Sequence, residues 1–456
     1  MASDGVDAGA VAGEALFRTR QIMAVDRLGV SSASHSKTYL GYVLILCTLV
    51  AILNAADRQV LSVLMPFIKK DLGASDTLLG FIAGPAVTIP HVLLGIPLAR
   101  LADRWSRRKV LAIAVATWSV FNSLSGLAAN ALQLTMARVA VGVGESGGTP
   151  GIQSMIAELF PTSFRSTALG IYSTSAYLGV LAGMMGGAAL GSYVGWRATF
   201  FWLGVPGVVM ALLCWWTLPR RGVAFVHAAE ADLKLQAVLT LCWERRTLRY
   251  LALGAGAFST FGLALATWMP SYFMRSHGMT IMEAGAWMGM LAVTGGVVGT
   301  VTSGMIVDRL SRRDLRWQLR VPAIGFFTVI PLYVVQLLWP AEWVFQIAGM
   351  RVPGVVLFSF PCAFLSALYP GPFFAALVSV VPPTMRSQAV ATISIVISII
   401  GAAIGPLFAG GVSDYFSGTY GSNALRYALL SMTVMVLIAG LLFWRAASHY
   451  VDEKVS

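Results

Sequence analysis

The sequence predicts an all-α integral membrane protein with twelve transmembrane helices in two pseudo-symmetric six-helix bundles. Three observations support this fold class: the composition, the number of apolar segments and an internal repeat. Apolar residues make up 57% of the 456 residues and charged residues only 11%, and the mean hydropathy is +0.75. Soluble domains carry about 25% charged residues, so most of this chain must lie in lipid.

The apolar segments divide the chain into two halves of six spans each, because a membrane-spanning helix needs about 20 apolar residues. The N-terminal half, 39–218, has expected spans at 39–65, 77–101, 110–129, 132–159, 166–193 and 197–218. The C-terminal half, 249–446, has expected spans at 249–273, 283–307, 319–339, 353–380, 388–413 and 425–446. The remaining segments are a disordered N-tail without a signal peptide, a polar linker and a C-tail, at 1–38, 219–248 and 447–456.

The distribution of basic residues orients the chain. Of the 32 Lys and Arg residues, 24 fall on the side of the termini, six on the opposite side and two within spans. Cytoplasmic loops carry such an excess, so both termini are expected to be cytoplasmic, in the inner membrane of a bacterium. Because the basic residues lie between apolar spans, the net charge of +12 indicates membrane topology and not nucleic-acid binding.

An internal repeat relates the two halves. Shifting the sequence by 205 residues aligns glycines, an Asp-Arg pair and a Ser-Arg-Arg string at the same helix boundary. The matches are Gly73 with Gly278, Gly80 with Gly285, Asp103-Arg104 with Asp308-Arg309, and Ser106-Arg107-Arg108 with Ser311-Arg312-Arg313. Parallel halves around a central cavity are typical of secondary transporters that rock between two states.

Two motifs carry a family resemblance. The segment from Gly304 to Arg313, with Asp308-Arg309 inside it, resembles the loop signature of the major facilitator superfamily. The N-terminal copy, 99–108, begins with Ala where the signature has Gly, and both copies have Ser where Gly is usual before the Arg pair. The charges are unchanged, so the resemblance implies the major facilitator fold.

Within that superfamily the chain resembles the Spinster-like group of sphingolipid and lysophospholipid transporters over roughly residues 40–445. The matching segments are Asp57-Arg58-Gln59-Val60-Leu61-Ser62, Leu72-Gly73-Ala74-Ser75-Asp76, Arg138 to Glu145, and Ser276-His277-Gly278-Met279. The resemblance implies a proton-linked role for Asp57 and Glu145. Symporters of small organic anions share the Asp-Arg pair and the Arg…Gly-x-Gly-Glu element, so the substrate stays open.

Four ionisable residues lie within apolar spans of the N-terminal half: Asp57, Arg58, Arg138 and Glu145. Such residues are costly in a bilayer and usually face a cavity and a partner. Arg138 and Glu145 lie on one helix face, about 10 Å apart along the axis, which is too far to pair directly. We expect Arg58 to pair with Glu145 and Asp57 to lie nearer the cavity and Arg138. A role in proton coupling or substrate binding is expected; the alternative is that these charges only lock two helices together.

The repeated loop charges predict a cytoplasmic latch. An Asp at the end of the second or eighth span can pair with a neighbouring Arg and with a helix N-terminus of the other half. This would close the cytoplasmic side when the protein opens outward. The alternative, that these are only topology-determining residues, accounts for the arginines but not for the aspartates. The predicted latch residues are Asp103, Arg104, Arg107, Asp308, Arg309 and Arg312.

Other signals are weaker. The GxGxxG string that begins at Gly142 lies inside an apolar span, so it predicts close helix packing and not a dinucleotide site. The four cysteines show no metal-binding spacing; no metal, no cofactor and no enzymatic constellation are expected. Residues that could line a cavity are His91, Tyr172, Tyr177, Trp268, Phe360 and Tyr369.

Charges on the N-terminal wall and an apolar C-terminal wall predict a proton-coupled transporter of an amphipathic anion or zwitterion. Lysophospholipids and sphingosine-1-phosphate-like lipids are the examples that the resemblance implies. The alternative is a proton-coupled symporter of a small aromatic carboxylate, bound by Arg58 or Arg138. A non-transporting sensor is less favoured, since the 219–248 linker and the tails offer no output domain. The expected partners are substrate, protons and membrane lipid, and the protein is expected to be a monomer.

Overall fold

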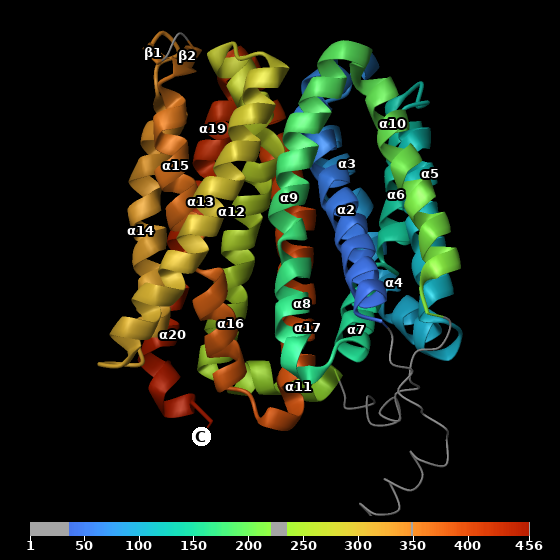
Figure 1. The fold of residues 1–456 in the computed structure, drawn as a ribbon. Coiled ribbons are helices and arrows are strands. Elements are labelled where there is room, and N and C mark those ends of the chain that lie inside the picture. Colours follow the sequence, from blue (N-terminus) through green and yellow to red (C-terminus); the bar gives the residue numbers. More distant parts are fainter. Residues whose placement is uncertain (1–35, 220–234, 348–349, 456) are drawn as a thin grey trace, which may run out of the picture.

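The computed structural model describes residues 36–219, 235–347 and 350–455. Its helices form two groups that stand side by side, one from each half of the chain (Figure 1). The N-terminal half contains α2 (Lys37–Leu72), α3 (Asp76–Ala83), α4 (Pro85–Arg104), α5 (Arg107–Ser125), α6 (Ala131–Glu145), α7 (Thr149–Leu159), α8 (Thr162–Ser173), α9 (Ser175–Leu181), η1 (Ala182–Gly186) and α10 (Gly187–Thr217).

The C-terminal half follows a connecting helix, α11 (Leu235–Glu244), and contains one small hairpin. Its elements are α12 (Arg246–His277), α13 (Ile281–Ser311), α14 (Trp317–Leu338), β1 (Val344–Ile347), β2 (Met350–Pro353), α15 (Val355–Ser366), α16 (Pro370–Ser379), η3 (Pro383–Met385), α17 (Arg386–Ser398), η4 (Ile399–Ile404), α18 (Gly405–Tyr420), η5 (Gly421–Asn423), α19 (Ala424–Ser431) and α20 (Thr433–Glu453).

Twelve crossings follow from these elements. Eight described stretches are long and apolar enough to span a membrane. Two of them reverse direction within the stretch, at Gly195 (φ 77°) and Gly421 (φ 53°), a backbone conformation that favours glycine, so each crosses twice. The less apolar α5 and the α6–α7 pair supply the last two crossings, packed against α10 and α4. The predicted fold class is therefore confirmed.

The bounds of the helices differ from the predicted spans mainly at the ends. Helix α2 extends beyond 39–65 to Lys37 and Leu72, and α20 runs past residue 446 to Glu453. A count of apolar residues finds only the part in hydrocarbon, whereas a helix can continue into the polar layer. The hairpin β1–β2, paired from Val344↔Pro353 to Ile347↔Met350, was not expected. Residues 1–35 of the predicted N-tail and residues 220–234 of the predicted linker lie outside the described residues.

The two ends of the bundle differ in how the halves meet. We call the end with Lys37 and Tyr450 the terminal end and the opposite one the far end (bottom and top of Figure 1). Towards the far end, α3 and α4 pack against α18 and η4, and α9, η1 and α10 pack against α13. At the terminal end, α7, α8, α16 and α17 pack mainly against helices of their own half. The structure is therefore closed at the far end.

Candidate functional site

The predicted charges of α2 and α6 meet in the middle of the N-terminal half. Arg58 Nε lies 3.2 Å from Glu145 Oε2, and Arg58 Nη2 donates to the same oxygen. This is the pair expected from the sequence. The Glu145 side chain is 1% exposed and that of Arg58 is 41% exposed. Arg58 is therefore the member of the pair that faces open space, while Glu145 stays buried behind it.

Asn122 of α5 joins the other two charges, which do not bond to each other directly. Its Nδ2 donates to Asp57 Oδ1 at 2.8 Å, and its Oδ1 accepts from Arg138 Nη2 at 2.9 Å. Asp57, Asn122 and Arg138 are all buried, and the Arg138 guanidinium lies 4.5 Å from the ring centroid of Phe200. Sequence reasoning missed Asn122, although an amide within an apolar span is itself a signal worth following.

The placement of Asp57 corrects one expectation. Asp57 was expected near the cavity, but it is 4% exposed and lines none of the three cavities described below. Successive residues of a helix point about 100° apart. The Arg58 side chain points into the cavity, so the Asp57 side chain points toward α5.

Two glycines let α6 carry its charges close to the neighbouring helices. A Cβ at Gly142 would lie 3.0 Å from Val87 Cα of α4, and one at Gly144 would lie 2.9 Å from Trp118 Cα of α5. Real Cβ atoms hardly ever approach so closely. The GxGxxG string thus begins inside a helix, as expected, and its glycines serve close packing.

Two cavities meet at Glu145. A cavity of about 70 Å³ lies between the halves, where Arg58, Arg138 and Glu145 face Leu263, Thr267 and Pro406, among others. A larger cavity of about 340 Å³ lies within the N-terminal half and is lined by Glu145, Asn54, Gln153, Tyr172 and Ser175, among others. Glu145 Oε1 is buried and has no hydrogen-bond partner among the described residues. A proton or a polar ligand group in either cavity can therefore reach this carboxylate.

The C-terminal half has a cavity of about 230 Å³ of a different character. It lies among α12, α13, α14 and α15 and is lined mainly by apolar side chains, including Phe258, Phe261, Met269 and Leu291. No charged side chain lines it. One polar group stands out: Gln336 donates to Ser359 Oγ at 2.6 Å, and its Oε1 is buried without a partner among the described residues.

The six residues expected to line a cavity occupy different environments in the structure. Tyr172 lines the 340 Å³ cavity, and Tyr177 instead joins the halves through Thr300 Oγ1 at 3.2 Å. Trp268 is a correction, because it is fully buried and donates to the Pro406 carbonyl at 2.9 Å.

Phe360 is 43% exposed and stacks on Phe364, and it lines none of the three cavities described above. Tyr369 packs among the rings of Phe258, Phe326 and Phe373. His91 lines none of the three cavities, and its Nδ1 is buried without a partner among the described residues.

Among the described residues, the C-terminal part of the predicted latch is not assembled. Asp308, Arg309 and Arg312 are exposed and form no ion pair or hydrogen bond with described residues. Arg107 pairs with Glu158 of α7, within its own half, and the side chains of Asp103 and Arg104 lie outside the described residues. A latch that forms only when the far end opens would be separated in this structure, which is closed at the far end. The latch therefore stays a prediction.

The described residues contain no group of three or more His, Cys, Asp or Glu side chains able to hold a metal ion. The four cysteines are free thiols. Cys242 lies in α11, outside the spanning helices, and burial raises the pKa of its thiol. Its reactivity toward thiol reagents should therefore be low.

Known proteins resemble this chain in sequence and in fold. The family model of the Major Facilitator Superfamily matches residues 47–352. An MFS-type efflux pump of Mycolicibacterium smegmatis is 32% identical and covers 88% of this chain and 91% of its own. A gallate transporter of Pseudomonas putida is 26% identical, over 82% of this chain and 86% of its own.

A solved structure is similar over nearly the whole fold. It is a bacterial homologue of the human lysosomal transporter Spinster, in an inward-facing and unoccupied conformation. The TM-score is 0.79 at 25% identity, and the match covers 92% of this chain and 100% of the other. The closed far end described above corresponds to an inward-facing state if the terminal end faces the cytoplasm.

Proposed function

Because the chain belongs to the Major Facilitator Superfamily and has a Spinster-like fold, we propose that it is a proton-coupled secondary active transporter of an amphipathic anion or zwitterion. It works by alternating access, in the inner membrane of a bacterium, and as a single chain, since the central cavity lies between two halves of one chain. The Arg58–Glu145 pair carries the proposal. It presents a half-exposed cation to the central cavity, held by a buried carboxylate.

The pair supplies a coupling mechanism. A carboxylate in low dielectric changes protonation when its partner moves, and protonation removes its hold on the arginine. Protonation of Glu145 thus frees Arg58 to bind the anionic group of a substrate, and bound anion in turn competes for Arg58 and favours protonation. Proton and anion binding therefore promote each other, as linkage requires.

The two walls suit a substrate with a charged head and an apolar body. The N-terminal wall carries Arg58 and Arg138, while the 230 Å³ cavity of the C-terminal half carries no charge. A lysophospholipid or a sphingosine-1-phosphate-like lipid would place its phosphate at the arginines and part of its chain in the apolar cavity. An ionised phosphate pairs strongly with a guanidinium.

A second candidate substrate is a small aromatic carboxylate, favoured by the similarity to a gallate transporter. Its carboxylate would bind Arg58 in the same way. A cavity of about 150 Å³ can hold a benzene ring, so the 230 Å³ cavity has room for one aromatic group. The two candidates share the coupling site and differ in what occupies the C-terminal half.

Flux measurements decide between them. The purified protein is reconstituted into liposomes, and uptake of labelled lysolipids and aromatic acids is followed with and without a pH gradient. Uptake of a lysolipid that depends on the gradient and is absent from protein-free liposomes supports the first candidate. Gradient-dependent uptake of aromatic acids alone supports the second. If neither class moves under any gradient, the proposed substrate class is wrong.

The orientation of the chain gives a separate prediction. Cysteines introduced at Lys37 and Ser448 should resist an impermeant thiol reagent applied outside intact cells, because both sites are expected to be cytoplasmic. A cysteine at Leu127, which is 70% exposed at the far end, should react and serves as the control. The four native cysteines are replaced first. Labelling of Lys37→Cys or Ser448→Cys from outside would reverse the topology.

A further inference from the structure

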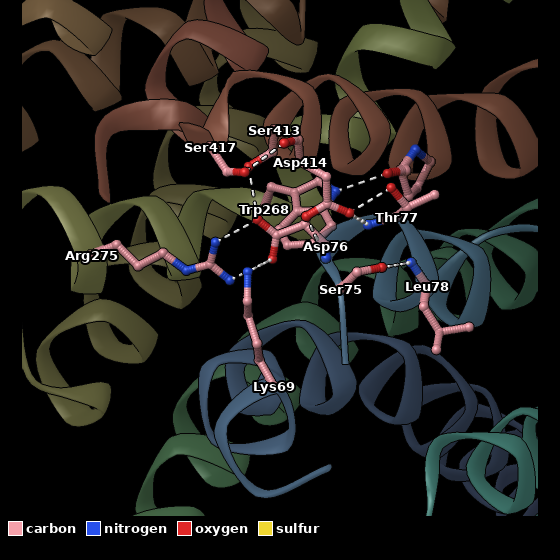
Figure 2. Close-up of polar contacts among 11 residues, drawn as sticks. Lys69, Ser75, Asp76, Thr77, Leu78, Trp268, Arg275, Ser413, Asp414 and Ser417 are labelled. Carbon is pink, nitrogen blue, oxygen red and sulfur yellow. Dashed lines mark hydrogen bonds and ion pairs between the residues drawn. The ribbon is translucent and has the colours of Figure 1, made fainter. Parts of the chain in front are cut away.

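Four charged side chains close the far end across the two halves, in a cluster that we call the far-end clasp: Lys69, Asp76, Arg275 and Asp414 (Figure 2). Arg275 Nη1 and Nη2 lie 2.7 Å and 2.9 Å from the two carboxylate oxygens of Asp76. Lys69 Nζ and Ser413 Oγ each donate to Asp76 at 2.7 Å. Asp76 is only 2% exposed, so its charge is fully enclosed by donors.

The second carboxylate of the clasp caps a helix of the other half. Asp414 Oδ1 accepts from the Asp76 backbone N–H at 3.0 Å, and Oδ2 accepts from the N–H and hydroxyl of Thr77 at 2.7 Å and 2.6 Å. These N–H groups begin α3 and have no partner within it. A carboxylate is favourable at this positive end of a helix. Asp414 belongs to α18, so a C-terminal side chain completes an N-terminal helix.

Close backbone contact between the same helices supports the clasp. A Cβ on Gly80 would lie 2.9 Å from the Pro406 carbonyl carbon, and one on Gly84 would lie 2.5 Å from the Ala402 carbonyl oxygen. Gly95, further along α4, has open space around its Cβ position. The halves can therefore approach closely at the far end only where these glycines leave room.

We propose that the far-end clasp is the gate of the side proposed to be extracellular, and that its opening is a required step of transport. The inference rests on the proposed alternating access. Every bond of the clasp except Lys69–Asp76 joins the two halves, so all the others must break when the far end opens. Lys69 and Asp76 both belong to the N-terminal half. Asp76 thus keeps one cation as it becomes exposed, so opening does not leave its carboxylate unpaired.

Spin-label distances test the gate without any substrate. One pair of labels, at Leu127 and Ser422, spans the far end, and another, at Ser163 and Arg313, spans the terminal end. In lipid nanodiscs the parent should show a short far-end distance. In Asp414→Ala and Asp76→Ala the ratio of far-end-open to far-end-closed molecules should rise by roughly tenfold or more, because charge-assisted hydrogen bonds across the halves are lost. The terminal-end distance should shorten in the same molecules.

Asp71→Ala is the matched control for the charge. Asp71 also lies at the far end and pairs with Arg197, but both residues belong to the N-terminal half and are 44% exposed. Its loss should leave both distances unchanged. If Asp414→Ala behaves like Asp71→Ala, the clasp is not the gate. Should Asp76→Ala fail to fold, Asp414→Ala alone decides.

The glycine contact gives an independent readout. Gly84→Ala, at the start of α4, should open the far end as well, whereas Gly95→Ala within α4 should not. Opening of the far end in both Gly84→Ala and Asp414→Ala would support the proposal, and parent-like far-end distances in Asp414→Ala would overturn it whatever Gly84→Ala shows. These distances are measured without substrate. If the parent transports none of the tested compounds but the variants still shift the distances, the proposed gate is supported and only the proposed substrate class is rejected.

Discussion

Asp57→Asn is expected to abolish transport driven by a proton gradient while leaving folding and substrate exchange intact. An asparagine at this position can still accept the hydrogen bond that Asn122 Nδ2 donates to Asp57 Oδ1, so the local packing is kept. It cannot take up or release a proton. It also removes the negative charge that reaches Arg138 through Asn122.

The measurement compares two driving conditions in proteoliposomes. A gradient of one pH unit is worth about 1.4 kcal/mol per proton and can support about tenfold accumulation for each coupled proton. Asp57→Asn should lose this accumulation and keep exchange of labelled for unlabelled substrate. Asp71→Asn, at an exposed site of the far end, should behave like the parent. A parent-like response of Asp57→Asn to the gradient would show that Asp57 is not needed for coupling and would leave that role to the Arg58–Glu145 pair alone.

Removing either member of the Arg58–Glu145 pair is expected to stop transport, but the two losses should differ in stability. Arg58→Ala leaves the buried Glu145 carboxylate without the donor that bonds its Oε2, and Oε1 has no partner among the described residues. Breaking a buried pair costs about 3–5 kcal/mol, and the low end applies here because the Arg58 side chain is 41% exposed. Glu145→Gln leaves Arg58 free to meet the cavity, so it should destabilise less.

A double-mutant cycle checks this expectation through thermal unfolding and flux. Arg58→Ala should lower the apparent Tm more than Glu145→Gln does. Adding Glu145→Gln to Arg58→Ala should recover most of the lost stability, because position 145 no longer carries an unpaired buried carboxylate, yet transport should stay absent. Recovery of gradient-driven flux in the double variant would show that the pair only locks α2 to α6.

The charge network shows how far sequence reasoning reaches. The pairing of Arg58 with Glu145 could be predicted because residues 138 and 145 share one helix face and cannot reach each other. The same reasoning placed Asp57 at the cavity, and the structure places it toward α5 instead. Helix geometry states that Asp57 and Arg58 diverge by about 100°, but it does not state which of the two faces which neighbour.

Properties that depend on residues close in sequence were accessible from the chain alone. The apolar spans, the repeated Asp-Arg loops and the buried charges follow from local composition and helix periodicity, and the lipid environment makes that signal strong. The far-end clasp was not accessible in this way. Asp76 and Arg275 are 199 positions apart and Asp76 and Asp414 are 338 apart, and each alone reads as an ordinary loop charge. The packing of α3 against α18 brings these groups within hydrogen-bond distance, and glycines that contact the other half allow that packing. Contacts between helices depend on the shape and register of both partners, which no single segment contains.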